Sequence, residues 1–109
     1  MMPKRLLFLC SRNRLRSPTA EAVFAAYPGV EVDSAGLSPD AELRLSAEQV
    51  EWADLIFVME AAHRERLKKG FGSLLAGKRV VVLGIPDDFG YMDPALVELL
   101  KVRCAPYLG

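Results

Sequence analysis

The chain has 109 residues, of which 51% are hydrophobic and 26% charged, as is typical of a single globular domain with a hydrophobic core. Its 14 Lys and Arg residues balance 14 Asp and Glu residues, so the charge indicates neither a nucleic-acid partner nor a membrane partner. No apolar run approaches the roughly 20 residues that a transmembrane helix needs. The 2 cysteines lie far apart in the sequence, which argues against a disulfide framework and favours the cytoplasm.

Short apolar segments typical of strands alternate with segments typical of helices. The predicted elements, in chain order, are a strand over 4–10, a helix from Ser17-Pro18 to Tyr27, a strand over 30–34, a short helix from Ser46 to about Ala53, a strand over 54–59, a charged helix over 60–69, a strand over 79–84 and a last helix from Asp93-Pro94. This alternation predicts an α/β fold, a single-domain three-layer sandwich whose four-stranded parallel sheet has helices on both faces.

Local signals mark where several of these helices begin and end. Ser17 and Pro18 are favoured as the cap and the first residue of a helix. Ser46 and Gln49 have the spacing of a capping box, and Gly70 is typical of a helix end. In open parallel sheets ligands bind beyond the carboxyl ends of the strands, so we expect chemistry near residue 10.

The segment that joins the first strand to the first helix places a thiol, Cys10, six residues before Arg16. A loop of this length can curl with its N–H groups inward, a nest that suits a phosphate-like dianion at a helix N-terminus. Arg16 would grip two oxygens of the anion, and the positive surroundings would hold Cys10 as a nucleophilic thiolate. The predicted phosphate-binding loop comprises Ser11, Arg12, Asn13, Arg14, Leu15, Arg16 and Ser17.

The order Cys-x5-Arg-Ser-Pro after the first strand, followed by Thr19-Ala20-Glu21-Ala22, resembles the low-molecular-weight protein tyrosine phosphatases. Their signature is Cys-x-Gly-Asn-x-Cys-Arg-Ser-Pro. Later segments also resemble the family in the same order, namely Asp33–Gly36, Ala53–Met59 and Pro86–Phe89. The resemblance implies one phosphatase-like domain over residues 1–109, with strand order 2-1-3-4 and no metal or other cofactor.

The resemblance also assigns roles to individual residues. It implies that Cys10 is the nucleophile, that Arg16 binds phosphate and that Ser17 supports the thiolate. It implies further that Asn13 and Ser34 form hydrogen bonds that hold the loop in shape. Simple turn and strand-end roles are the alternative for these last two residues.

The chain departs from the family pattern at several points. Arg12 replaces a glycine, Leu15 replaces the second loop cysteine and Asp88 stands where the family has proline. The stretch between Gly36 and Trp52 is also shorter than in the family, where it helps to build the pocket walls. The resemblance therefore supports phosphate chemistry for this protein more strongly than it supports any particular substrate.

Cleavage of a phosphomonoester also needs an acid that protonates the departing oxygen. The loop after the fourth strand offers Asp87, Asp88 and Asp93. Asp93 precedes a proline at a helix start and is explained as an N-cap. Asp87 stands at the family's distance from Phe89 and is the predicted acid, with Asp88 or a plain polar turn as the alternatives.

Four further residues have simpler interpretations. His63 lies in a helix rich in charged residues, without ligands at metal spacing, and we expect it on a solvated face. Cys104 and Trp52 are expected in the core. Tyr91, like Phe89, lines a slot for a phenyl ring or packs on its own domain.

The predicted function is hydrolysis of phosphotyrosine-like groups through a phosphocysteine. The expected partner is a phosphotyrosine protein or a small aryl phosphate, and the expected state is a monomer or weak dimer. The main alternative is a non-catalytic phosphate-binding or phosphoprotein-binding module. Arsenate reduction would need resolving cysteines, of which only Cys104 is present, and a phosphocarrier domain would not need Arg16.

Overall fold

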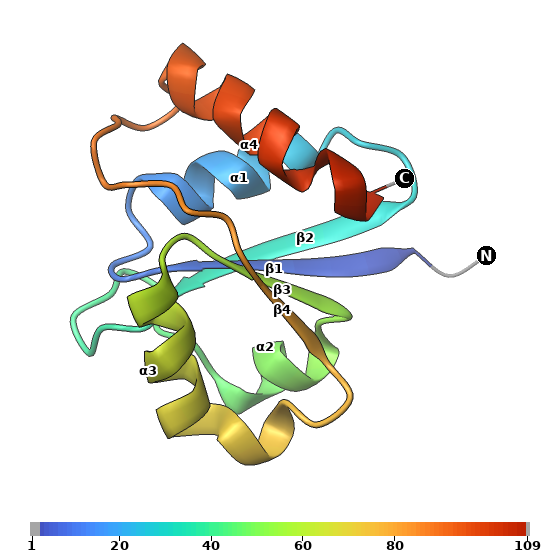
Figure 1. The fold of residues 1–109 in the computed structure, drawn as a ribbon, viewed down its shortest axis with the longest axis vertical. Helices are drawn as coiled ribbons and strands as arrows, with labels where there is room; N and C mark the ends of the chain where they lie inside the picture. The colour runs from blue at the N-terminus through green and yellow to red at the C-terminus, as the bar shows by residue number, and fades with distance from the viewer. Residues whose placement is uncertain (1–2, 109) are drawn as a thin grey trace.

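The computed structural model describes residues 3–108, in which four parallel strands form one sheet in the order β2-β1-β3-β4. The strands are β1 (Lys4–Cys10), β2 (Val30–Gly36), β3 (Leu55–Val58) and β4 (Arg79–Val82). Figure 1 shows the sheet as the middle of three layers. The predicted α/β fold class and the strand order 2-1-3-4 are confirmed.

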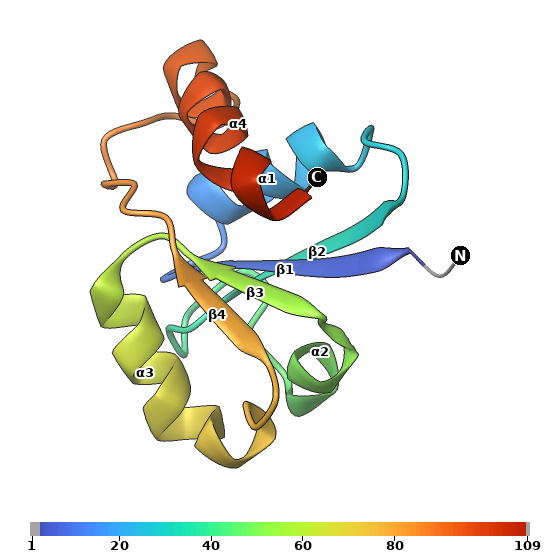
Figure 2. The same ribbon diagram turned by 45° about the vertical axis from the view of Figure 1, so that its right-hand side comes forward.

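Two layers of helices cover the sheet, one on each face. In Figures 1 and 2, α1 (Arg16–Phe24) and α4 (Pro94–Leu108) lie together on one face. The opposite face carries α2 (Ala47–Trp52) and α3 (Ala61–Phe71), and the short 3₁₀ helix η1 (Gly72–Leu74) follows α3. No helix within residues 3–108 is both long enough and apolar enough to cross a bilayer.

The central strand β1 supplies side chains to both hydrophobic layers, because successive residues of a strand point to opposite faces. Leu6, Phe8 and Cys10 belong to the cluster under α1 and α4, whereas Leu7 and Leu9 belong to the cluster on the opposite face. This two-sided burial explains the continuous apolar run in the sequence. It also directs the thiol of Cys10 to the face that carries α1.

Some element boundaries differ from the sequence-based prediction. Helix α1 begins at Arg16 and ends at Phe24, so its N-cap is Leu15, whose side chain cannot accept a hydrogen bond. Ser17 lies inside the helix, where its hydroxyl contacts the sulfur of Cys10. Helix α3 continues through Gly70, which lacks the left-handed conformation of a helix-ending glycine. Strand β2 runs on to Gly36, and the 3₁₀ helix η1 was not predicted.

Other local predictions are confirmed. The hydroxyl of Ser46 accepts the backbone N–H of Gln49, whose side chain accepts the N–H of Ser46 in return. The carboxylate of Asp93 accepts the N–H of Ala95 and so caps α4. Cys104 is fully buried, and burial raises the pKa of its thiol to about 12.

Gly36, at the end of β2, allows two backbone segments to approach each other closely. A methyl group at this position would lie 2.5 Å from the Cβ of Ala41 and 2.7 Å from the carbonyl oxygen of Ser11. Neither neighbour is the end of a flexible side chain, so neither can move aside easily. A glycine is therefore required where β2 meets the loop that follows β1.

We predict that Gly36→Ala lowers the free energy of unfolding by about 1–3 kcal/mol, because the added methyl group overpacks this contact. Gly70→Ala is the matched control, since a Cβ there meets no atom within 4 Å and alanine favours the helix. Urea unfolding monitored by circular dichroism measures both. Equal effects of the two substitutions would show that Gly36 is not needed for close approach.

Candidate active site

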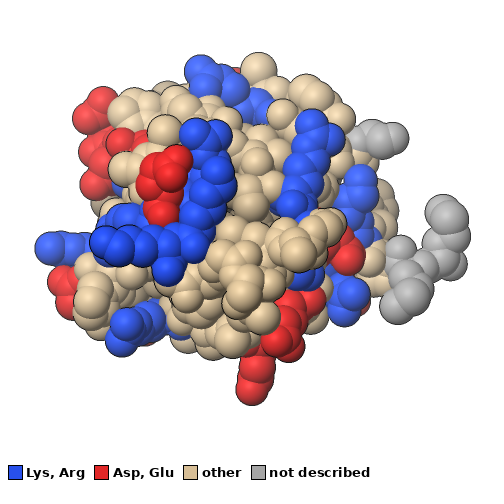
Figure 3. Space-filling model, turned by 60° about the horizontal axis from the view of Figure 1, so that its bottom comes forward, with Lys and Arg blue, Asp and Glu red and all other residues tan. Residues whose placement is uncertain are grey.

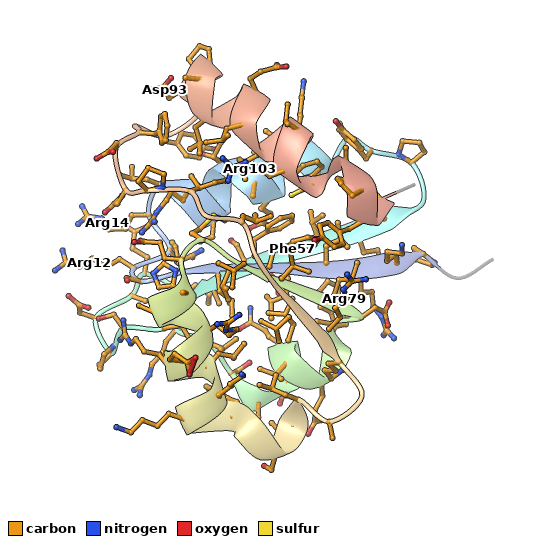
Figure 4. The ribbon with its side chains drawn as sticks, viewed as in Figure 1. Arg12, Arg14, Phe57, Arg79, Asp93 and Arg103 are labelled. Atoms are coloured by element: carbon orange, nitrogen blue, oxygen red, sulfur yellow. The ribbon has the colours of Figure 1, made fainter. Side chains whose placement is uncertain are left out.

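A pocket of about 400 Å³ opens where β1 ends, and it brings most of the predicted site residues together. It lies between the loop of residues 10–17, called here the 10–17 loop, and the segment that follows β4. Its lining residues are Cys10, Ser11, Arg12, Arg14, Leu15, Arg16 and Asp87. In Figure 4, Arg12 and Arg14 stand at this end of the sheet and point away from the body of the protein.

The first three carbonyl groups of the 10–17 loop bond to the segment that follows β2. The carbonyl oxygens of residues 10, 11 and 12 accept hydrogen bonds of 3.0, 2.8 and 3.0 Å from the N–H groups of residues 37, 38 and 42. The N–H groups without a recorded acceptor within residues 3–108 include those of Ser11, Arg12, Arg14 and Leu15. With its carbonyls engaged outside, the loop has N–H donors left for an anion, as in other anion-binding nests.

The tight curl of the loop depends on Asn13, which has a left-handed φ of 57°. Asparagine adopts this conformation more readily than most residues. Arg12, which replaces the family's glycine, is not among the residues with positive φ, so its side chain strains no backbone there. The arginine at this position is therefore compatible with the curled loop.

A chain of hydrogen bonds fixes the donors around the sulfur of Cys10. The backbone N–H of Asn13 donates to the sulfur at 3.2 Å, and the hydroxyl oxygen of Ser17 lies 2.9 Å from it. The side-chain amide of Asn13 donates to Ser17 at 3.0 Å and to Ser34 at 2.9 Å. Because the Ser17 hydroxyl accepts from the amide of Asn13, its own proton is left to donate to the sulfur. The Ser34 hydroxyl, which also accepts from Asn13, donates to the carboxylate of Glu21.

Asn13, Ser17 and Ser34, predicted from the sequence as supporting residues, are thus brought together around Cys10. Glu21 was not predicted, although it stands in the segment that resembles the family. Its carboxylate accepts the proton of the Ser34 hydroxyl and ends that branch of the hydrogen-bond chain. Donors aimed at a sulfur stabilise its negative charge.

The guanidinium of Arg16 is buried, with only 4% of its side chain exposed, and protein groups bind one of its terminal nitrogens. One terminal nitrogen, Nη1, donates to the carboxylate of Glu60 at 2.5 Å and to the carbonyl oxygen of Ile85 at 2.8 Å. This bond from Arg16 lowers the pKa of Glu60 below its ordinary value. The Nε atom lies 3.6 Å from the carboxylate of Asp87, at the pocket. Of the remaining nitrogens, Nε faces Asp87 at the pocket, and Nη2 has no hydrogen-bond partner within residues 3–108.

The prediction that His63 lies on a solvated face is wrong. The side chain is buried, its Nδ1 accepts the N–H of Glu60 at 3.2 Å, and its Nε2 lies 3.1 Å from the hydroxyl of Ser11. Because Nδ1 accepts a hydrogen bond, the proton of the neutral ring is on Nε2, which donates to Ser11. Burial lowers the pKa of His63, and the nearby charge of Arg16 lowers it further.

His63 and Glu60 connect α3 to the 10–17 loop, and the sequence analysis assigned neither to the site. Their three-residue spacing at a helix start is a signal that could have indicated a pairing. The charged residues elsewhere in α3 suggested exposure instead. The ring is nevertheless turned inward, toward Ser11.

Of the three candidate acids, only Asp87 lines the pocket. Asp88 is exposed and does not line the pocket, and Asp93 caps α4.

The aromatic residues Phe89 and Tyr91 do not line the pocket either. Phe89 packs against the core under α4, whereas Tyr91 is exposed. Trp52 is half-buried against the opposite core. Among residues 3–108, no three or more His, Cys, Asp or Glu side chains are grouped to hold a metal ion.

The chain is similar to several phosphatases, although no protein-family model matches it. A protein-arginine-phosphatase of Geobacillus stearothermophilus is 31% identical over an alignment of 94 residues that covers 64% of this chain. The chain spans 64% of the length of that relative.

Two solved structures are also similar over most of the chain. Wzb of Vibrio vulnificus, in complex with benzylphosphonate, has a TM-score of 0.77 at 22% identity and covers 96% of this chain and 97% of its own. A cysteine-to-serine mutant of the arginine phosphatase YwlE, with a phosphorylated active-site serine, has a TM-score of 0.73 at 26% identity. It covers 95% of each chain. Both similarities extend over the whole three-layer fold.

We predict that the protein loses stability as the pH falls from 7.5 to 5.5, by up to about 1.4 kcal/mol. His63 is the single histidine, and its folded pKa is lowered from 6.5, so below that pH the unfolded chain takes up a proton that the folded chain does not. Urea unfolding at several pH values measures how the free energy of unfolding changes with pH. His63→Gln should flatten it, and a slope unchanged in this variant would contradict the buried neutral ring.

Proposed function

We propose that this chain is a member of the low-molecular-weight protein tyrosine phosphatase family and hydrolyses phosphate groups through a phosphocysteine intermediate on Cys10. The observation that carries the proposal is the pocket in which the sulfur of Cys10, the loop N–H groups and Arg16 meet. Such a site combines a nucleophile with donors for the charge of the transferring phosphoryl group. The phosphorylated active-site serine of the YwlE mutant supports a covalent route.

The first step transfers the phosphoryl group to the enzyme. The loop N–H groups and Arg16 bind the phosphate oxygens and align the phosphorus above the sulfur of Cys10. The sulfur attacks in line, a sulfur–phosphorus bond forms, and the bond from phosphorus to the substrate oxygen breaks. Asp87 donates a proton to the departing oxygen, because an unprotonated alkoxide or phenoxide is a poor leaving group.

The second step regenerates the enzyme with water. Asp87, now ionised, accepts a proton from a water molecule as its oxygen attacks the phosphorus of phosphocysteine. The sulfur–phosphorus bond breaks, inorganic phosphate leaves, and the sulfur returns as a thiolate. The donors from Asn13 and Ser17 stabilise that thiolate, which makes it a better leaving group.

The proposed substrate is phosphotyrosine in a protein, or a small aryl phosphate. The benzylphosphonate bound to Wzb, an arylmethyl phosphonate, supports this choice. A phosphorylated arginine is a second candidate, because a relative of 31% identity is a protein-arginine-phosphatase. The same residues would serve both, with Asp87 protonating a phenolic oxygen in one case and a guanidine nitrogen in the other.

Two alternatives are less well supported. Arsenate reduction needs a second accessible thiol, whereas Cys104 is fully buried and burial raises its pKa to about 12. A module that binds phosphate without turnover would not need a carboxylate at the pocket, and Asp87 is present there. Turnover is the property that separates the enzyme from such a module.

We predict that Asp87→Asn lowers kcat for phenyl phosphate by about 10²–10³-fold, because the phenolate then leaves without a proton. The loss should be smaller for p-nitrophenyl phosphate, whose leaving group needs protonation less. Asp88→Asn is the matched control and should leave both rates unchanged. Steady-state kinetics with the two substrates measures the difference, and equal losses for both would contradict the role of Asp87 as acid.

Cys10→Ser should abolish turnover of both substrates while retaining phosphate binding. Residual turnover at the wild-type rate in this variant would exclude the phosphocysteine route. Phosphate binding by wild-type protein without any turnover would instead identify a non-catalytic module. Isothermal titration calorimetry with inorganic phosphate, run beside the kinetics, distinguishes these outcomes.

A further inference from the structure

A second hollow, of about 900 Å³, lies next to the pocket on the face of the sheet that carries α3. It runs between residues 36–45 and the second half of α3, and we call it the basic groove. Its apolar lining is formed by Leu37, Leu45 and Phe71, and three exposed cations line it as well, namely Arg44, Arg66 and Lys69. Figure 3 views the molecule from this side and shows Lys and Arg side chains over the left-hand part of the molecule, with Asp and Glu side chains among them.

The cations of the basic groove have no carboxylate partners. Within residues 3–108, no ion pair involves Arg44, Arg66 or Lys69. Arg66 donates to the carbonyl oxygen of Leu37 at 3.3 Å, and this bond connects α3 to the loop after β2. A carbonyl oxygen carries no net charge, so the bond leaves the positive charge of Arg66 unneutralised. The groove thus concentrates three positive charges in a chain whose net charge is zero. Such a surface favours an anionic partner.

The basic groove and the catalytic pocket share a wall. Gly36 lines the groove, and it also packs against the backbone of Ser11 in the 10–17 loop. The wall carries two carboxylates, but Asp40 pairs with Arg12 at 3.6 Å and Glu42 pairs with Arg14 at 3.4 Å. A chain that leaves the pocket over this wall therefore crosses paired charges and reaches unpaired cations.

We propose that the basic groove binds an acidic segment of a phosphoprotein substrate, next to the phosphorylated residue in the pocket. This inference rests on the proposed function and extends it, because it commits the site to a peptide rather than to a small phosphate ester. Acidic side chains of the segment meet Arg44, Arg66 and Lys69. An apolar side chain of the segment packs against Leu37, Leu45 and Phe71. The backbone of a nucleic acid has no apolar group that could make this contact.

The test compares two phosphotyrosine peptides that share one leucine and differ only in flanking glutamates or lysines. For wild-type protein, kcat/KM should be higher for the glutamate peptide, mainly through KM, and the preference should shrink as salt is added. The double variant R44E/K69E should lower kcat/KM for the glutamate peptide roughly tenfold and raise it for the lysine peptide. Both changed residues are exposed and make no recorded side-chain hydrogen bond or ion pair, so folding should be retained.

Two controls separate this inference from the proposed function. The rate with p-nitrophenyl phosphate, which does not reach the groove, should be the same in wild type and R44E/K69E. Lys101→Glu, a charge reversal on α4 at the opposite face of the sheet, should leave the peptide preference unchanged. Normal turnover of p-nitrophenyl phosphate with no preference between the peptides would show that the basic groove does not bind an acidic segment, while the proposed function would remain intact.

The groove is also testable if no phosphate ester is turned over. A fluorescein-labelled, unphosphorylated glutamate peptide should bind wild-type protein in an anisotropy titration and bind R44E/K69E more weakly. No binding, or equal binding to both proteins, would overturn the inference. Complete displacement of the peptide by an equimolar single-stranded RNA of the same length would also overturn it, in favour of a nucleic-acid surface.

Discussion

The hydrogen bonds from residues 37, 38 and 42 to the carbonyl oxygens of residues 10, 11 and 12 are the constraint on which the site depends. A short loop cannot direct its N–H groups to one point while its carbonyls point there too, and buried backbone polar groups need partners. The segment after β2 supplies those partners from outside the pocket. Gly36 makes this possible because it admits the close approach of the two backbones.

The site also combines groups from the carboxyl ends of all four described strands. The sulfur lies at the end of β1, and Ser34, near the end of β2, belongs to its hydrogen-bond chain. Glu60 follows β3, and the carbonyl of Ile85 follows β4; both hold the guanidinium of Arg16. A parallel sheet therefore aligns the proposed nucleophile, the proposed anion-binding arginine and the proposed acid at a single edge, as doubly wound folds generally do.

Local sequence patterns predicted the alternation of strands and helices and the loop that carries Cys10 and Arg16, because strand length, helix caps and the Cys-x5-Arg spacing are properties of nearby residues. The strand order and the supporting residues were predicted from the family resemblance. The failures involve contacts between distant segments. His63 is buried because it reaches Ser11, 52 positions away, and no pattern within α3 contains that contact. Ser17 has the sequence of a helix cap, but the sulfur of Cys10 engages its hydroxyl. The pocket lining includes Asp87 and not Asp88, a difference that depends on the course of the chain after β4 and that no pattern in adjacent residues contains.

The central claim is that the 10–17 loop binds a phosphate dianion directly above the sulfur of Cys10. Two-dimensional amide NMR spectra, recorded while inorganic phosphate is titrated into the wild-type protein, test this claim most directly. We expect saturable shifts that are largest for the amides of Ser11, Arg12, Arg14 and Leu15, which have no hydrogen-bond acceptor within residues 3–108. Shifts that are absent from the loop, or that are centred on another part of the chain, would show that the loop does not bind phosphate.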